Sequence, residues 1–183
     1  MSRKYKFRKP EAAYFISFAT VKWIDLFTDE IYLSILADSV TYCRKHKGME
    51  LYSYVFMRNH VHLLFRSLEN NPSGLIRDFK GFTSRKLIQA IQNNPDESRK
   101  EYLLKQFKEA GLQRSNVKNY QLWQQDNQQI EVYSERIVRQ KVNYIHNNPV
   151  KAGFVADPID WKYSSARNYA GDQTILEIDL MGE

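Results

Sequence analysis

This sequence has few of the residues that define fibrous, disordered or disulfide-rich proteins. Its 183 residues include one cysteine, five prolines and seven glycines. A single cysteine, Cys43, excludes an intramolecular disulfide and favours a reducing compartment. The low content of proline and glycine excludes collagen-like and low-complexity chains. We therefore expect an ordinary folded domain, in which Cys43 is a core thiol on an apolar helix face.

Long apolar runs are also missing. No run of about 20 apolar residues occurs, so we expect no membrane-spanning helix and no membrane partner. The N-terminal segment is basic but lacks the apolar stretch of a secretory signal peptide.

Aromatic and basic residues are abundant instead. The chain has 12 tyrosines and 10 phenylalanines, and its formal net charge is +6. A basic chain indicates a polyanionic partner such as nucleic acid, and aromatic rings can stack on unpaired bases. Residues 1–10 form a basic arm without an acid, which we interpret either as a phosphate-contacting arm or as a solubilising tail.

Hydrophobic patterning predicts an alternation of strands and helices in the first half of the chain. Residues 13–21 are aromatic and β-branched, as in a buried strand. A helix follows from Asp29 to Gly48, then two strands at 49–57 and 60–66 joined by a tight turn or fused into one. A second helix is expected after residues 70–73 and runs to about residue 91.

The second half is predicted to contain a helical insertion, a strand and a further helix. Residues 93–118 resemble an insertion with a short helix, and 120–124 are a candidate strand. A helix is expected over 133–148, ended by Pro149. A C-terminal extension over 156–183 contains a possible short strand at 175–178.

The order β-α-β-β-α-β predicts one α+β domain over residues 1–183, a ferredoxin-like split βαβ sandwich. Its antiparallel sheet would carry helices on one face. The additional late helix would lie near the other face and bring chemistry to it.

The strongest chemical signal is a pair of histidines within the second of the two adjacent strands. His60 and His62 are two residues apart, so both imidazoles project from the same face of a strand. Neutral imidazole is a common metal ligand. A histidine in an apolar strand is more often a buried structural group, so the pair needs support from elsewhere in the chain.

That support comes from the predicted late helix. Tyr144 lies at the margin of its apolar stripe, and Asn148 is four residues on, beside it on the same side. The Asn148 amide oxygen can complete a metal site with His60 and His62. A metal there would polarise a phosphodiester that Tyr144 attacks as nucleophile. No general base for Tyr144 can be identified.

Four segments resemble one protein family. Residues 59–65 are similar to the histidine-hydrophobic-histidine (HUH) motif of single-tyrosine transposases, and residues 144–155 to their nucleophile helix. Residues 122–124 and 160–166 resemble the REP-associated tyrosine transposase branch. Together, in this order and spacing, they cover nearly the whole chain.

The resemblance implies a ferredoxin-like fold and cleavage of single-stranded DNA beside a hairpin. It assigns Tyr144 as the nucleophile, which becomes linked to the 5′ phosphate, and His60, His62 and Asn148 as ligands of Mn²⁺ or Mg²⁺. Imidazole ligands favour manganese of the two. It also implies a cytoplasmic, nucleoid-associated bacterial protein, and favours a monomer over a homodimer.

Two other functions remain open: a non-catalytic module that binds single-stranded nucleic acid, and a metal-dependent nuclease in which water attacks. His146 is interpreted as structural or as a DNA contact, and Trp123 and Trp161 as packing residues. The candidate DNA contacts are basic side chains of the arm, of the turn before the histidines and of the second helix: Arg3, Lys4, Lys6, Arg8, Lys9, Arg58, Arg77, Lys80, Arg85 and Lys86.

Overall fold

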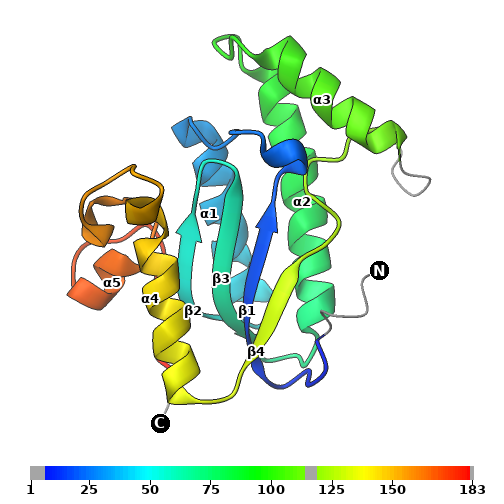
Figure 1. Ribbon diagram of the computed structural model, residues 1–183. Helices are drawn as coiled ribbons and strands as arrows, with labels where there is room; N and C mark the ends of the chain where they lie inside the picture. The colour runs from blue at the N-terminus through cyan, green and yellow to red at the C-terminus, as the bar shows by residue number, and fades with distance from the viewer. Residues whose placement is uncertain (1–6, 114–118, 182–183) are drawn as a thin grey trace.

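A computed structural model describes residues 7–113 and 119–181 (Figure 1). Four strands form one sheet: β1 (Ala13–Ala19), β2 (Met49–Phe56), β3 (His60–Ser67) and β4 (Gln128–Val132). Their order is β2-β3-β1-β4, and every neighbouring pair is antiparallel. The predicted split βαβ sandwich is confirmed.

Helices cover both faces of this sheet. The helices α1 (Glu30–His46) and α2 (Pro72–Asn93) lie on one face, and α4 (Glu135–Lys151) crosses in front of β2 on the other (Figure 1). The larger core lies between the sheet and α1 and α2. A smaller apolar cluster, which includes Val142 and Ile145, fixes α4 to the opposite face.

The insertion is part of the main core. Its helix α3 (Lys100–Leu112) confirms the predicted helical stretch. Leu103 and Phe107 are fully buried in the larger core, so α3 extends the layer of α1 and α2.

The predicted strand at 120–124 is wrong, because the fourth strand lies at Gln128–Val132. Trp123 makes only an isolated bridge to Thr20. Leu122 and Trp123 are both buried in the larger core, whereas strand residues alternate faces, so two consecutive apolar residues mark an irregular segment here. The edge strand β4 is polar and escaped detection because only Val132 is buried.

Two smaller expectations also fail. Residues 175–178 form no strand, although Leu176 is buried in the core. Helix α4 continues past Pro149 to Lys151. Proline in the last turn removes only one backbone hydrogen bond, and the carbonyls of Asn148, Pro149 and Val150 are capped by the amides of residues 152–154.

Three short helices complete the chain: η1 (Val21–Trp23), η2 (Pro158–Asp160) and α5 (Ala166–Ala170). Within the described part of the chain, no helix has the length and apolarity needed to cross a membrane.

Candidate active site

The two histidines lie side by side at the start of β3. His60 pairs with Ala19 of β1 and His62 with Ser17, and the two ring centroids are 4.8 Å apart. His62 is buried and stacks on Phe15 of β1 at 5.4 Å. The prediction that both imidazoles share one face is therefore confirmed.

Helix α4 places an amide and a phenol against this pair. Ser134 caps its N-terminus, and buried Val142 and Ile145 hold it on the sheet. Asn148 Oδ1 lies 3.3 Å from His60 Nε2, and Asn148 Nδ2 lies 3.3 Å from His62 Nε2. The Tyr144 ring meets the His62 ring edge-on at 5.3 Å.

Both imidazoles are neutral near pH 7. Burial, with smaller contributions from the nearby His60 and Lys141, lowers the pKa of His62 to about 3. Burial also lowers the pKa of His60. Each neutral ring keeps one nitrogen lone pair, which a metal ligand requires.

The donor pattern at His60 fits a cation. Asn59 Oδ1 lies 2.7 Å from His60 Nδ1 and can only accept, so Nδ1 carries the proton and Nε2 a lone pair. That lone pair faces another acceptor, Asn148 Oδ1. Either the Asn148 amide turns end for end or a cation comes between the two atoms.

The three predicted ligands therefore converge, and their chemistry suits a divalent ion. The described residues contain no cluster of three His, Cys, Asp or Glu side chains that could bind a metal. The third donor here is an amide oxygen. Two imidazoles and one amide form a neutral set that leaves room for phosphate oxygens, and nitrogen donors favour manganese over magnesium.

Two lysines of α4 flank the tyrosine. Lys141 Nζ lies 5.9 Å and Lys151 Nζ 5.7 Å from the Tyr144 ring centroid, and Tyr144 itself is 40% exposed. Sequence reasoning missed both lysines. Their positions three residues before and seven after Tyr144 place them on its side of the helix, so helical spacing contained the signal.

Asn59 ties the histidines to the turn after β1. While Asn59 Oδ1 contacts His60, Asn59 Nδ2 donates to Asp25 Oδ1 at 2.7 Å and to the Trp23 carbonyl at 3.3 Å. Its own carbonyl accepts from the Thr20 amide at 2.9 Å. Asn59 thus both turns the chain and orients the imidazole of the next residue.

The turn that Asn59 holds is strained. Lys22 and Trp23 both have a φ of 55°, a left-handed conformation that costs a non-glycine residue about 1–2 kcal/mol. The Lys22 ammonium donates to Gln106 of α3, whereas the Trp23 ring lies against His60 at 5.6 Å. Trp23 was not among the predicted site residues.

Those predicted DNA contacts that the structure describes lie on different elements of the fold. Arg3, Lys4 and Lys6 lie outside the described residues. Arg8 and Lys9 are exposed, and Lys9 pairs with Glu131. Arg58 lies closest to the histidines in sequence, and its guanidinium packs 4.3 Å from the Phe154 ring centroid.

The basic residues of α2 lie on the other side of the sheet from the histidines. Arg77, Arg85 and Lys86 are exposed there. The Lys80 ammonium instead donates to the Gln124 carbonyl at 2.8 Å and to Asn127 Oδ1 at 2.6 Å, and burial lowers its pKa to about 8. Lys80 therefore secures the segment that leads to β4.

His146 has a structural position. Its Nε2 lies 2.9 Å from Ser165 Oγ, and Ser165 in turn accepts from the Tyr54 amide of β2. Burial lowers its pKa to about 4. His146 therefore joins α4, β2 and the C-terminal segment rather than the histidine pair.

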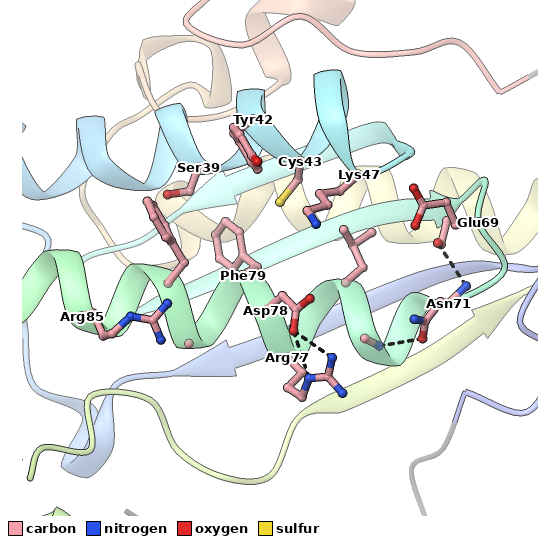
Figure 2. Close-up of a pocket in the computed structure, with 15 residues that line it drawn as sticks. Ser39, Tyr42, Cys43, Lys47, Glu69, Asn71, Arg77, Asp78, Phe79 and Arg85 are labelled. Carbon is pink, nitrogen blue, oxygen red and sulfur yellow. Dashed lines mark hydrogen bonds and ion pairs between the residues drawn. The ribbon is translucent and has the colours of Figure 1, made fainter. Parts of the chain in front are cut away.

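A cavity of about 530 Å³ lies between α1 and α2, on the face away from the histidines (Figure 2). Arg77 at its rim is paired with Asp78, and burial raises the pKa of the Cys43 thiol to about 11. A protonated thiol is unreactive, which agrees with the predicted core role of Cys43. The predicted site residues His60, His62, Tyr144 and Asn148 lie on the α4 side instead.

Comparison of the sequence with models of known protein families identifies the family of this chain. The family model described as "Transposase IS200 like" matches residues 11–120, more than half of the chain. The chain belongs to the IS200-like transposase family. The matched region of this transposase contains both histidines and ends before α4, so the assignment of Tyr144 and Asn148 depends on the geometry described above.

Comparison with solved structures extends the similarity of this transposase beyond residues 11–120. The structure of a REP-associated tyrosine transposase bound to a REP hairpin matches with a TM-score of 0.66 and 17% identity, over 100% of this chain and 95% of that one. The fold is therefore shared over the full length. A Deinococcus radiodurans r1 protein named as a transposase matches with a TM-score of 0.45 and 21% identity, over 80% of this chain and 95% of that one. No curated protein matches in sequence.

Proposed function

We propose that this transposase cleaves and rejoins single-stranded DNA through a covalent bond between Tyr144 and a 5′ phosphate. The observation that carries the proposal is the convergence of four side chains from two elements. β3 supplies His60 and His62, and α4 supplies Asn148 and Tyr144, with the Tyr144 ring 5.3 Å from that of His62.

The residues have separate tasks in this reaction. His60, His62 and Asn148 would hold Mn²⁺ or Mg²⁺, which supplies Lewis-acid polarisation of the scissile phosphate when bound. Tyr144 Oη forms a bond to phosphorus as the P–O3′ bond breaks. The phenol loses its proton, and the departing 3′ oxygen gains one as a free hydroxyl. The reverse attack by a 3′-hydroxyl restores the DNA and the tyrosine.

Lys141 and Lys151 suit the charge that develops in this step. Both ammonium groups lie within 6 Å of the Tyr144 ring centroid, so they attract the phosphate and suit the negative charge of the transition state. Neither is a carboxylate or a neutral imidazole, and the proton of Tyr144 leaves through another group or water.

Hairpin DNA is the proposed substrate. The full-length fold match is to a protein bound to a REP hairpin, and the chain is basic. Histidines, amide and tyrosine all come from one chain in this structure, which supports a monomer as the proposed active form.

Covalent capture tests the proposal. The full chain is incubated with single-stranded DNA that carries the inverted repeats flanking its gene, and with Mn²⁺, then run on a denaturing gel. We expect a protein–DNA adduct that Tyr144→Phe and EDTA abolish. Tyr133→Phe is the matched control, because Tyr133 is an exposed tyrosine just before α4.

The two other functions give different results in the same experiment. Cleavage without an adduct, equally strong in Tyr144→Phe, would identify a nuclease that uses water. Binding without cleavage, unchanged by EDTA, would identify a non-catalytic binding module.

A further inference from the structure

Trp23 is an exposed aromatic residue at the edge of the candidate active site and not a core residue. Its side chain is 56% exposed, whereas Trp123 is buried. A large apolar ring left in water gains little burial, so the fold derives little stability from it. Nevertheless, its position is closely specified by the surrounding hydrogen bonds.

The backbone that presents Trp23 is fixed on both sides. Its carbonyl accepts from the Asn59 amide group, and its own amide donates to the Thr20 carbonyl at 3.1 Å. The buried Thr20 hydroxyl donates to the Ile24 carbonyl at 2.8 Å and closes the turn. Two successive residues in the left-handed region persist only where the surrounding structure holds them.

The turn directs the ring to the edge of the candidate active site. The Trp23 ring lies 5.6 Å from His60, at an interplanar angle of 70°. The same Asn59 side chain contacts both His60 and the Trp23 carbonyl, so the metal ligand and the exposed ring share one support.

The surroundings favour an anionic, ring-bearing ligand. Arg58 adjoins Asn59 in the turn before β3, and Lys141 and Lys151 lie beyond the histidines around Tyr144. An exposed indole and several cations around one site are a combination that binds single-stranded nucleic acid, where bases stack on aromatic rings and cations face phosphates.

We infer that Trp23 forms a stacking site for an unpaired DNA base next to the scissile phosphate. The inference rests on the proposed function for the identity of the ligand as single-stranded DNA. A base stacked on Trp23 would fix the register of the strand at His60 and His62, because adjacent nucleotides follow one backbone. The stacking site would thus position the phosphate for Tyr144.

The test uses the full chain with Tyr144→Phe as parent, so that binding is measured without cleavage. The probe is a fluorescein-labelled dT oligonucleotide of about 20 nucleotides, since stacking tolerates any base. We expect Trp23→Ala to weaken binding about tenfold, from the roughly 1–3 kcal/mol that stacking contributes per base. Trp23→Phe, which keeps a ring, should stay within about threefold of the parent.

Two controls make the result specific. Tyr42→Ala removes a ring that is 55% exposed on α1, across the sheet, and should leave affinity unchanged. Unlabelled dT oligonucleotide should quench part of the tryptophan fluorescence of the parent and of Trp161→Phe, but none in Trp23→Phe. Equal affinity of Trp23→Ala and the parent, or quenching that survives in Trp23→Phe, would overturn the inference.

Failure of the stacking site and failure of the proposed function are distinguishable. Trp23-dependent binding together with no adduct in the native chain would reject Tyr144 as nucleophile and leave the stacking site intact. An adduct at Tyr144 together with Trp23-independent binding would reject the stacking site alone.

Discussion

At the scale of single residues, the site depends on three neutral donors that meet from two elements. Asn148 is the decisive one, because its amide lies 3.3 Å from both histidine Nε2 atoms. Histidine pairs on strands are common without metal, and the Asn148 amide is the observation that favours the proposed metal site over a purely structural pair. The side-chain alternation of β3 and the four-residue spacing on α4 were both readable in the sequence.

Removing the amide should weaken metal binding without unfolding the protein. We expect Asn148→Ala to lower Mn²⁺ affinity at least about tenfold, and Asn148→Asp to raise it because a carboxylate adds charge. Isothermal titration with Mn²⁺ measures both. The matched control is Asn147→Ala, because the Asn147 side chain bonds to the Asn143 carbonyl of its own helix. Equal affinity of Asn148→Ala and the native chain would remove Asn148 from the site.

At the scale of elements, helix α4 links the stability of the fold to the geometry of the candidate active site. Its apolar side, which includes Val142 and Ile145, packs on the sheet, and the neighbouring side carries Tyr144 and Asn148. Any loosening of this packing therefore moves the proposed metal ligand Asn148 and the proposed nucleophile Tyr144 together.

Ile145→Ala should accordingly impair two properties at once. Ile145 is fully buried, so the truncation should lower the free energy of unfolding by about 3 kcal/mol. Mn²⁺ affinity should fall with it. Leu36→Ala, at a fully buried position of α1 on the far face, should destabilise similarly but leave Mn²⁺ affinity unchanged. Urea unfolding and Mn²⁺ titration compare the two, and a parallel loss of affinity in Leu36→Ala would contradict the assignment.

The elements with strong periodicity were predictable, and those formed by long-range contacts were not. The residues of β1, α1 and α2 repeat apolar side chains at strand or helix spacing, and their ends fall within a few residues of prediction. β4 could not be found, because its pairing with β1 creates a strand from a polar segment with a single buried residue, Val132. The position of Trp23 was equally hidden, since it depends on Asn59, 36 residues away.

At the scale of the whole molecule, charge is divided between two faces. The sheet separates Lys141 and Lys151 beside the site from Arg77, Arg85 and Lys86 on α2. A net charge of +6 attracts DNA in general, but of these two described groups of cations the one on the α4 side is placed to contact a phosphate held at the histidines.

The salt dependence of DNA affinity should show which of the two basic faces contacts the DNA. For single strands each phosphate contact adds about 0.7 to the slope of log affinity against log salt. The double variant Lys141→Ala/Lys151→Ala should therefore lower that slope by about 1.4. Arg85→Ala/Lys86→Ala removes the same charge from α2 and should change it little. Anisotropy titrations of labelled single-stranded DNA over a range of salt measure both slopes, and equal changes would place the DNA elsewhere.

The proposed reaction depends on Tyr144 as the nucleophile, and one measurement tests this assignment directly. The adduct formed with Mn²⁺ is digested with nuclease and trypsin, and its peptides are analysed by mass spectrometry. Trypsin releases Val142–Lys151, in which Tyr144 is the only tyrosine. The account predicts that the residual nucleotide is found on this peptide. A nucleotide on any other peptide, or cleaved DNA without a linked peptide, would contradict it.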